Sequence, residues 1–166
     1  YPRDTLLKIV DQVPSIRAIK DWAGNVPQHE MHIRMLQSLP RPVNVLTTHS
    51  AWLFSSLVLG CNGLLSGSGS VIADLQAQLF RAMQANDLAE AKRLNDRIQP
   101  TARVFYAEPW ADMHNRMKEA LVLLGRLPRA VVRPPLVKIS RAEIDRIRAA
   151  LVEAELLDPK AARDAA

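Results

Sequence analysis

The stretch that decides the fold is Ile16-Arg17-Ala18-Ile19-Lys20, a compact apolar run that is too short for a helix and is bounded by loop residues. Two further short runs of this kind follow at residues 43–47 and 62–66, and helical patterns separate them. Strands that alternate with helices are typical of βαβ units, because a parallel crossover is long enough to hold a helix. The sequence therefore predicts an α/β fold that begins with three parallel strands.

The periodicity of the first half predicts helices at residues 4–13, 27–39, 50–59 and 70–84. Ser50 is expected to cap the third of these helices at its N-terminus, and Gly60 is expected to close it. Proline residues limit the first two helices, since the residue before a proline disfavours helical geometry.

The second half changes to helices at residues 87–106 and 110–124, followed by a proline-punctuated extended segment. Pro100 is expected to kink or break the first of these helices. Ser140 and Glu143 form a capping-box pattern that introduces a last helix. We therefore predict three parts: strands with their helices at residues 1–84, appended helices at 85–157, and a tail at 158–166.

Composition excludes several classes of protein. The 166 residues are 48% hydrophobic and 23% charged, which is typical of a globular chain and not of a disordered one. Cys61 is the only cysteine, so no intrachain disulfide forms and a reducing, cytoplasmic location is expected. No apolar run reaches the roughly 18–20 residues that span a bilayer, so no membrane partner is expected. The net charge of +5 is spread over scattered lysines and arginines, which does not favour nucleic-acid binding.

Lys20 is the strongest candidate for chemistry, because it ends a predicted buried strand and precedes a loop. Desolvation lowers the pKa of a buried lysine, and the free amine can then attack a carbonyl to form a Schiff base. In parallel α/β folds the carboxyl ends of the strands face the active site. The alternative is a lysine that ends a strand and extends into solvent. The pattern alone favours that alternative.

Four motifs in order resemble the dihydrodipicolinate synthase / N-acetylneuraminate lyase family. Ala18-Ile19-Lys20-Asp21 is similar to the family's Schiff-base strand, and Val45-Leu46-Thr47-Thr48 resembles its seventh barrel strand. Leu59-Gly60-Cys61-Asn62-Gly63-Leu64-Leu65-Ser66 is similar to the eighth strand. The C-terminal helices and the Val132-Arg133-Pro134-Pro135-Leu136 loop also match. The resemblance covers roughly residues 2–157 and favours Lys20 as a catalytic residue.

This resemblance implies a (β/α)8 TIM barrel, represented here by strands six to eight, their helices and a C-terminal helical extension. It implies a class I aldolase, a lyase or synthase in which Lys20 forms an imine with pyruvate or a related 2-oxo acid. No metal or organic cofactor is implied, and a homotetramer is typical of the family. By position, Thr48 and Leu65 are expected to bind substrate, with Thr47 and Ser66 as weaker candidates.

Several departures from the family pattern leave an alternative open. Thr48 stands where many members carry glycine, and the Gly67–Ser70 segment replaces one that usually ends in Asn. The family's proton-shuttling tyrosine and carboxylate-binding loop are not found in these residues, and Tyr1 stands too close to Lys20 to be assigned the tyrosine's role. A complete barrel needs about 250 residues, so we expect upstream sequence or another chain to supply the rest, and the segment alone to be inactive. The alternative is a retuned or inactive 2-oxo-acid-binding protein on the same scaffold, and a free-standing helical interaction module ranks last.

Three other features are expected to be structural. His29-Glu30-Met31-His32 lacks one intervening residue of the zinc-protease motif, so we interpret it as part of a surface helix. Gly67–Ser70 lies between a strand and a helix and is interpreted as a tight turn rather than an anion-binding loop. Cys61 has no neighbouring base in the sequence and is interpreted as an inert packing residue.

Overall fold

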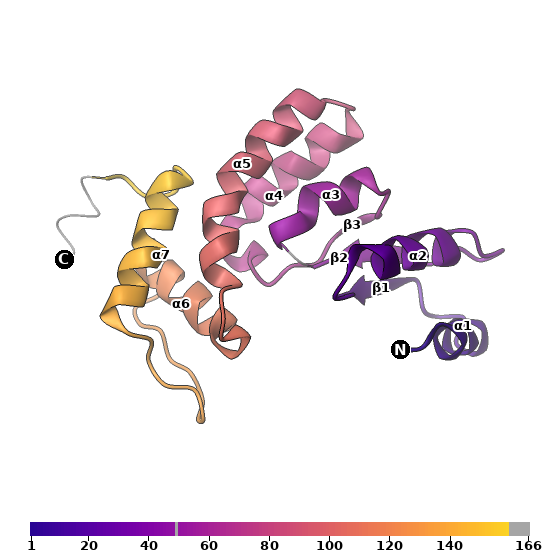
Figure 1. Ribbon diagram of the computed structural model, residues 1–166, viewed down its shortest axis with the longest axis horizontal. Coiled ribbons are helices and arrows are strands. Elements are labelled where there is room, and N and C mark those ends of the chain that lie inside the picture. Colours follow the sequence, from indigo (N-terminus) through magenta and orange to yellow (C-terminus); the bar gives the residue numbers. More distant parts are fainter. Residues whose placement is uncertain (49, 160–166) are drawn as a thin grey trace. The chain divides into compact units, whose positions relative to one another are not determined.

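The computed structural model describes residues 1–48 and 50–159 and divides the chain into two compact units, Tyr1–Ser66 and Gly67–Ala166. The first unit alternates helices with strands (Figure 1), in the order α1 (Arg3–Gln12), β1 (Ala18–Asp21), α2 (Val26–Gln37), β2 (Asn44–Thr47), a 3-10 turn at Ser50–Trp52, α3 (Leu53–Val58) and β3 (Gly63–Leu64). The three predicted strands are therefore present. β1 and β2 begin one or two residues after their expected starts, and β3 is shorter than expected.

The strands form one parallel sheet in the order β1-β2-β3. Lys20 pairs with Leu46, and Leu46 pairs with Gly63. One residue further along each strand, Asp21 pairs with Thr47. The predicted parallel α/β arrangement is confirmed for this unit, and the register aligns the carboxyl ends of all three strands at one edge of the sheet.

Helix α2 begins where the sequence provides a cap and a proline. The side chain of Asn25 accepts a hydrogen bond from the backbone N–H of Gln28 at 2.8 Å, and Pro27 occupies the first turn, where a missing N–H costs nothing. Its buried side includes Ile33 and Leu36, which pack into a core with Val45 of β2. The helix thus covers one face of the sheet.

The predicted cap of the third helix is wrong. Ser50 lies inside a 3-10 turn, so α3 begins only at Leu53 and is six residues long. The predicted end is confirmed, because Gly60 follows α3 with a φ of +96°, a left-handed conformation that favours glycine.

The second unit is helical and contains α4 (Gly69–Gln84), α5 (Leu88–Phe105), a 3-10 turn at Trp110–Asp112, α6 (Met113–Leu123) and α7 (Arg141–Glu153). Helix α5 packs against α4, α6 and α7. The capping prediction at the last helix is confirmed, since the Ser140 hydroxyl accepts a hydrogen bond from the Glu143 N–H at 3.2 Å. No helix among the described residues is both long enough and apolar enough to cross a membrane.

Helix α5 runs through Pro100 without a break, because its buried side (Ala91, Leu94, Ile98, Ala102 and Phe105) stabilises the helix in spite of one missing hydrogen bond. Helix α4 belongs to the second compact unit, whereas the predicted division at residue 84 follows barrel topology and stays a prediction. Most of the predicted tail, residues 160–166, lies outside the described residues.

Candidate active site

Three of the predicted site residues stand at the carboxyl ends of the three strands or directly after them. Side chains alternate between the faces of a sheet, and paired residues of neighbouring strands point the same way. Lys20 therefore shares its face with Leu46 and Gly63, with which it is aligned in register. Thr48 and Leu65 stand two residues beyond these partners, directly after the ends of β2 and β3.

Thr47 lies on the opposite face. Its hydroxyl donates a hydrogen bond to the Ser56 hydroxyl of α3 at 2.9 Å, and the side chain is buried. Ser66 follows Leu65 and is half-buried. The alternation of side chains thus separates Thr47 from Lys20, and this placement does not support a contact between Thr47 and a substrate held at Lys20.

Lys20 is exposed, although the sequence predicts a buried strand. The reason is that α2 and α3 cover only the face that carries Asp21 and Thr47. The other face of β1, with Ala18 and Lys20, has no cover among the described residues. The predicted desolvation of the Lys20 amine is therefore not found in these residues.

Thr48 and Leu65 differ in environment. Thr48 is fully buried, and its hydroxyl has no hydrogen-bond partner within the described part of the chain. Leu65 is 52% exposed. A buried hydroxyl without a partner is costly in a folded protein and is a feature often associated with function.

A buried polar cluster lies on the helix-covered face, directly after Lys20. Nδ1 of His29 is 2.7 Å from Oδ2 of Asp21, and Nδ1 of His32 is 3.1 Å from the same oxygen. The other carboxylate oxygen, Oδ1, accepts a hydrogen bond from the backbone N–H of Ala23 at 2.9 Å. His29, His32 and Asp21 are only 2%, 6% and 8% exposed. The surface interpretation of the two histidines is therefore wrong.

The cluster keeps Asp21 ionised. Burial by itself raises the pKa of the Asp21 carboxyl, but hydrogen bonds from His29 and His32, together with their electrostatic attraction, bring that pKa below its ordinary value of 3.8. At neutral pH the carboxylate is thus a charged acceptor with three N–H donors directed at it.

A periodic signal in the sequence could have revealed these histidines. His29, His32, Ile33 and Leu36 follow the i, i+3, i+4, i+7 spacing of one helix face, and all four are buried. Asp21 alternates with Lys20 and therefore faces that helix. A comparison of the two histidines with a metal-binding motif alone does not predict their burial, because their hydrogen-bond partner is Asp21 on the preceding strand.

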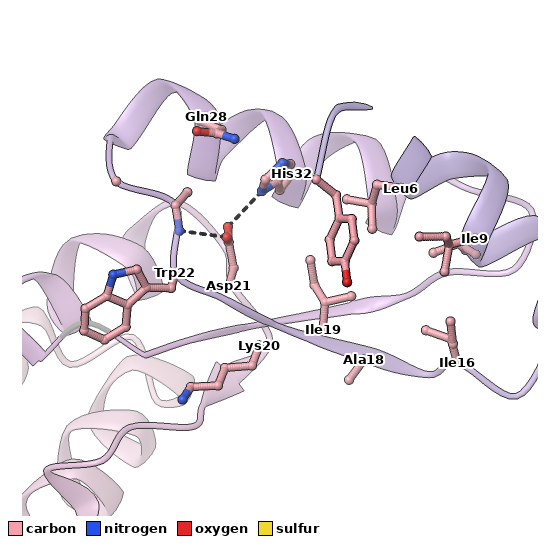
Figure 2. Close-up of a pocket in the computed structure, with 14 residues that line it drawn as sticks. Leu6, Ile9, Ile16, Ala18, Ile19, Lys20, Asp21, Trp22, Gln28 and His32 are labelled. Carbon is pink, nitrogen blue, oxygen red and sulfur yellow. Dashed lines mark hydrogen bonds and ion pairs between the residues drawn. The ribbon is translucent and has the colours of Figure 1, made fainter. Parts of the chain in front are cut away.

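A pocket of about 470 Å³ opens beside β1 and is lined by residues of α1, β1, α2 and the loop between them. Figure 2 shows Leu6 and Ile9 on one side and His32 and Gln28 on another, while Asp21 points to His32 and Lys20 points away from it. Among the described lining residues, Thr48 and Leu65 do not occur. The pocket follows the outer edge of β1, and Lys20 is among the residues that line it.

Cys61 behaves as a packing residue, as predicted. It is buried, and burial raises the pKa of its thiol to about 11, so little of the reactive thiolate forms near neutrality. Over residues 1–48 and 50–159, no three His, Cys, Asp or Glu side chains gather in a way that could hold a metal ion.

Comparison with known proteins identifies the family. The family model described as the dihydrodipicolinate synthetase family matches residues 4–154 of this sequence. The chain therefore belongs to that family.

Two curated relatives illustrate the extent of the similarity. The 4-hydroxy-tetrahydrodipicolinate synthase of Laribacter hongkongensis is 28% identical over 154 residues, which are 93% of this chain and 50% of the relative. The enzyme of the same name from Maridesulfovibrio salexigens is 25% identical over 144 residues, which are 86% of this chain and 47% of the relative. The chain thus spans about half the length of the curated relatives it matches.

The similarity to solved structures also covers about half of each solved chain. A dihydrodipicolinate synthase from Thermotoga maritima is similar with a TM-score of 0.84 at 20% identity, over 93% of this chain and 51% of that one. YagE, a prophage protein of the dihydrodipicolinic acid synthase family from E. coli K12 solved in complex with pyruvate, gives a TM-score of 0.80 at 25% identity, over 90% of this chain and 49% of its own. The chain has the fold of about half of such a protein.

Proposed function

We propose that this chain carries the imine-forming half of a class I aldolase-type enzyme, a carbon–carbon lyase or synthase acting on pyruvate or a related 2-oxo acid. Lys20 is the residue proposed to form the imine. The observation that supports the proposal is the position of Lys20 near the carboxyl end of β1, in register with Leu46 and Gly63, with Thr48 and Leu65 directly after β2 and β3. The pyruvate bound to YagE supports the substrate class.

The strands β1, β2 and β3 are proposed to be strands six, seven and eight of a (β/α)8 barrel. Their parallel pairing and sequential order are what such a barrel requires. In a closed barrel the outer edge of β1 would pair with a further strand, and the uncovered face that carries Lys20 would become the interior.

The proposed chemistry needs only groups of the protein and the substrate, with no metal or organic cofactor. The neutral Nζ of Lys20 attacks the keto carbon of the 2-oxo acid, and loss of one water from the carbinolamine leaves a C=N bond. The imine withdraws electrons from the neighbouring carbon, so a bond at that carbon can form or break. Thr48, with its unpartnered buried hydroxyl, is proposed to hydrogen-bond the substrate beside the imine, and Leu65 to line the same pocket.

A second candidate is a 2-oxo-acid-binding protein that does not form the imine. Burial is what activates a lysine for this chemistry, and the exposure of Lys20 among the described residues favours this candidate.

Trapping with borohydride distinguishes the two. Incubation of the chain with pyruvate and sodium borohydride, followed by peptide mass spectrometry, is expected to leave one reduced pyruvate on the peptide that contains Lys20. Lys20→Arg is the matched control and should show no adduct at this position. Pyruvate binding without any adduct would favour the second candidate, and neither binding nor adduct would contradict both for this chain. The tetramer and the cytoplasmic location stay predictions that sedimentation and localisation experiments can test.

A further inference from the structure

The Asp21 carboxylate is held by donors from two directions. Two imidazoles of α2 reach Oδ2, at 2.7 and 3.1 Å, and the Ala23 N–H of the following loop reaches Oδ1. These contacts connect the end of β1 both to the next helix and to the next loop. The residue they fix is the immediate neighbour of Lys20.

The protonation of the cluster follows from its geometry. An ionised carboxylate only accepts hydrogen bonds, so each imidazole that reaches Oδ2 through Nδ1 must carry its proton on Nδ1. Nε2 of both rings is buried and has no partner among the described residues. A buried N–H without an acceptor costs free energy. Both histidines are therefore assigned as neutral rings protonated on Nδ1.

The environment of each ring fixes its orientation. The ring of His29 meets Trp52 edge to face, with 6.2 Å between the centroids and 87° between the planes. His32 lies at the wall of the pocket beside β1. The groups whose hydrogen bonds lower the pKa of the Asp21 carboxyl are these two histidines. No other acid or base is needed to account for its ionisation.

We propose that His29 and His32 are positioning residues, which hold Asp21 on the helix side of β1 and so direct Lys20 to the opposite face. Because neighbouring side chains of a strand point to opposite faces, fixing Asp21 fixes the direction of Lys20. The contribution to chemistry at Lys20 rests on the proposed function. The assigned tautomers and the anchoring of β1 do not rest on the proposed function.

The first test uses the unmodified chain and nitrogen-15 NMR. Long-range proton–nitrogen spectra at neutral pH are expected to show His29 and His32 protonated on Nδ1 only, with assignment by single substitutions. A ring protonated on Nε2 alone at either position would overturn the proposal, because such a ring cannot donate to Asp21 through Nδ1. This measurement is independent of any reaction with pyruvate.

The second test compares two double substitutions. In H29N/H32N each amide can still donate near the position of Nδ1, whereas H29F/H32F keeps the rings and removes the donors. Amide exchange at residues 20–23 is expected to be faster by about fivefold or more in H29F/H32F and close to that of the unmodified chain in H29N/H32N. Equal exchange in both variants would overturn the anchoring.

The third test measures borohydride trapping per folded molecule. A loss of about tenfold or more in the trapping rate is expected for H29F/H32F, with recovery in H29N/H32N. Unchanged trapping in folded H29F/H32F would reduce the histidines to a structural role. The control is Glu30→Gln, because Glu30 lies between the histidines on α2 and, within residues 1–48 and 50–159, forms an ion pair with the exposed Arg34. If the unmodified chain is not trapped at all, the proposed function fails, and the tautomers and amide exchange still decide the positioning role.

Discussion

The two units each bury a charged side chain, but they satisfy it differently. In the helical unit, Arg116 is 1% exposed and donates to the Glu143 carboxylate and to the backbone carbonyl groups of Phe105, Ala107, Glu108 and Pro109. In the sheet unit, Asp21 is held by two histidines whose outer nitrogens have no partner among the described residues.

The two buried charges differ in how fully the groups around them are hydrogen-bonded. The N–H groups of Arg116, a residue of α6, donate to the C-terminal end of α5 and to α7, so Arg116 has a structural role. The Asp21 cluster leaves buried polar atoms unmatched beside the face that carries Lys20, together with the unmatched hydroxyl of Thr48. Unmatched buried groups are costly and concentrate at functional sites. Among the described residues, unmatched buried atoms also occur in the helical unit, at Oδ1 of Asn95 and Oε1 of Glu119, so they do not by themselves distinguish the two units. The chemistry proposed for the sheet unit rests on Lys20.

The largest effect on stability is expected at Arg116. Arg116→Met leaves Glu143 and four carbonyl groups without their donor, and removing one partner of a buried ion pair costs about 3–5 kcal/mol. Amide exchange in α6 and α7, followed by peptide mass spectrometry, should increase accordingly. Arg116→Lys keeps the charge without the planar fork, so its free energy of unfolding should lie between those of the unmodified chain and Arg116→Met. An unfolding free energy within 1 kcal/mol of the unmodified chain, roughly the range of a surface substitution, would remove the structural role of Arg116.

A smaller loss is expected at Asp21. Asp21→Asn replaces a charged acceptor and should lower the free energy of unfolding of the sheet unit by roughly 1.5–3 kcal/mol. Because the folded pKa of Asp21 is below 3.8, its ionised form stabilises the fold above that pH, and this stabilisation is lost as the pH falls from 3.8 through the folded pKa.

Urea unfolding at a series of pH values measures this effect. The difference between the unmodified chain and Asp21→Asn should be constant near neutrality and shrink in acid below pH 3.8. A difference that grows in acid would contradict the assigned sign of the pKa shift.

The smallest effects come from two adjacent threonines on opposite faces. Thr47→Val removes a hydroxyl that is bonded to Ser56 and should cost about 1 kcal/mol. Thr48→Val removes a hydroxyl without a partner and should be close to neutral or slightly stabilising. Urea denaturation of both variants checks this. Equal losses would show that the Thr48 hydroxyl is also bonded and would weaken its assignment to substrate.

Much of this architecture could be predicted from the sequence. Short apolar runs separated by helical periods predicted the parallel strands, and Ser140 with Glu143 predicted the start of the last helix. These features are local, since periodicity and capping depend on neighbouring residues. The resemblance to the family placed Thr48 and Leu65 near Lys20 as expected substrate-binding residues, and this stays a prediction.

The features that were missed depend on contacts distant in sequence. The burial of His29 and His32 depends on Asp21 of the preceding strand, and the continuity of α5 through Pro100 depends on its packing against other helices. The exposure of Lys20 depends on which face of β1 the helices cover. A single strand pattern cannot distinguish a face covered by helices from one that is left open.

Peptide mapping after borohydride reduction decides whether Lys20 forms the imine, because it locates the adduct among the lysines of the chain. With pyruvate as the probe, we expect the adduct on Lys20, and we expect the exposed Lys92 of the helical unit to stay unmodified. An adduct spread equally over Lys20 and Lys92, or found only on other lysines, would contradict the assignment of the sheet unit as the one that carries chemistry.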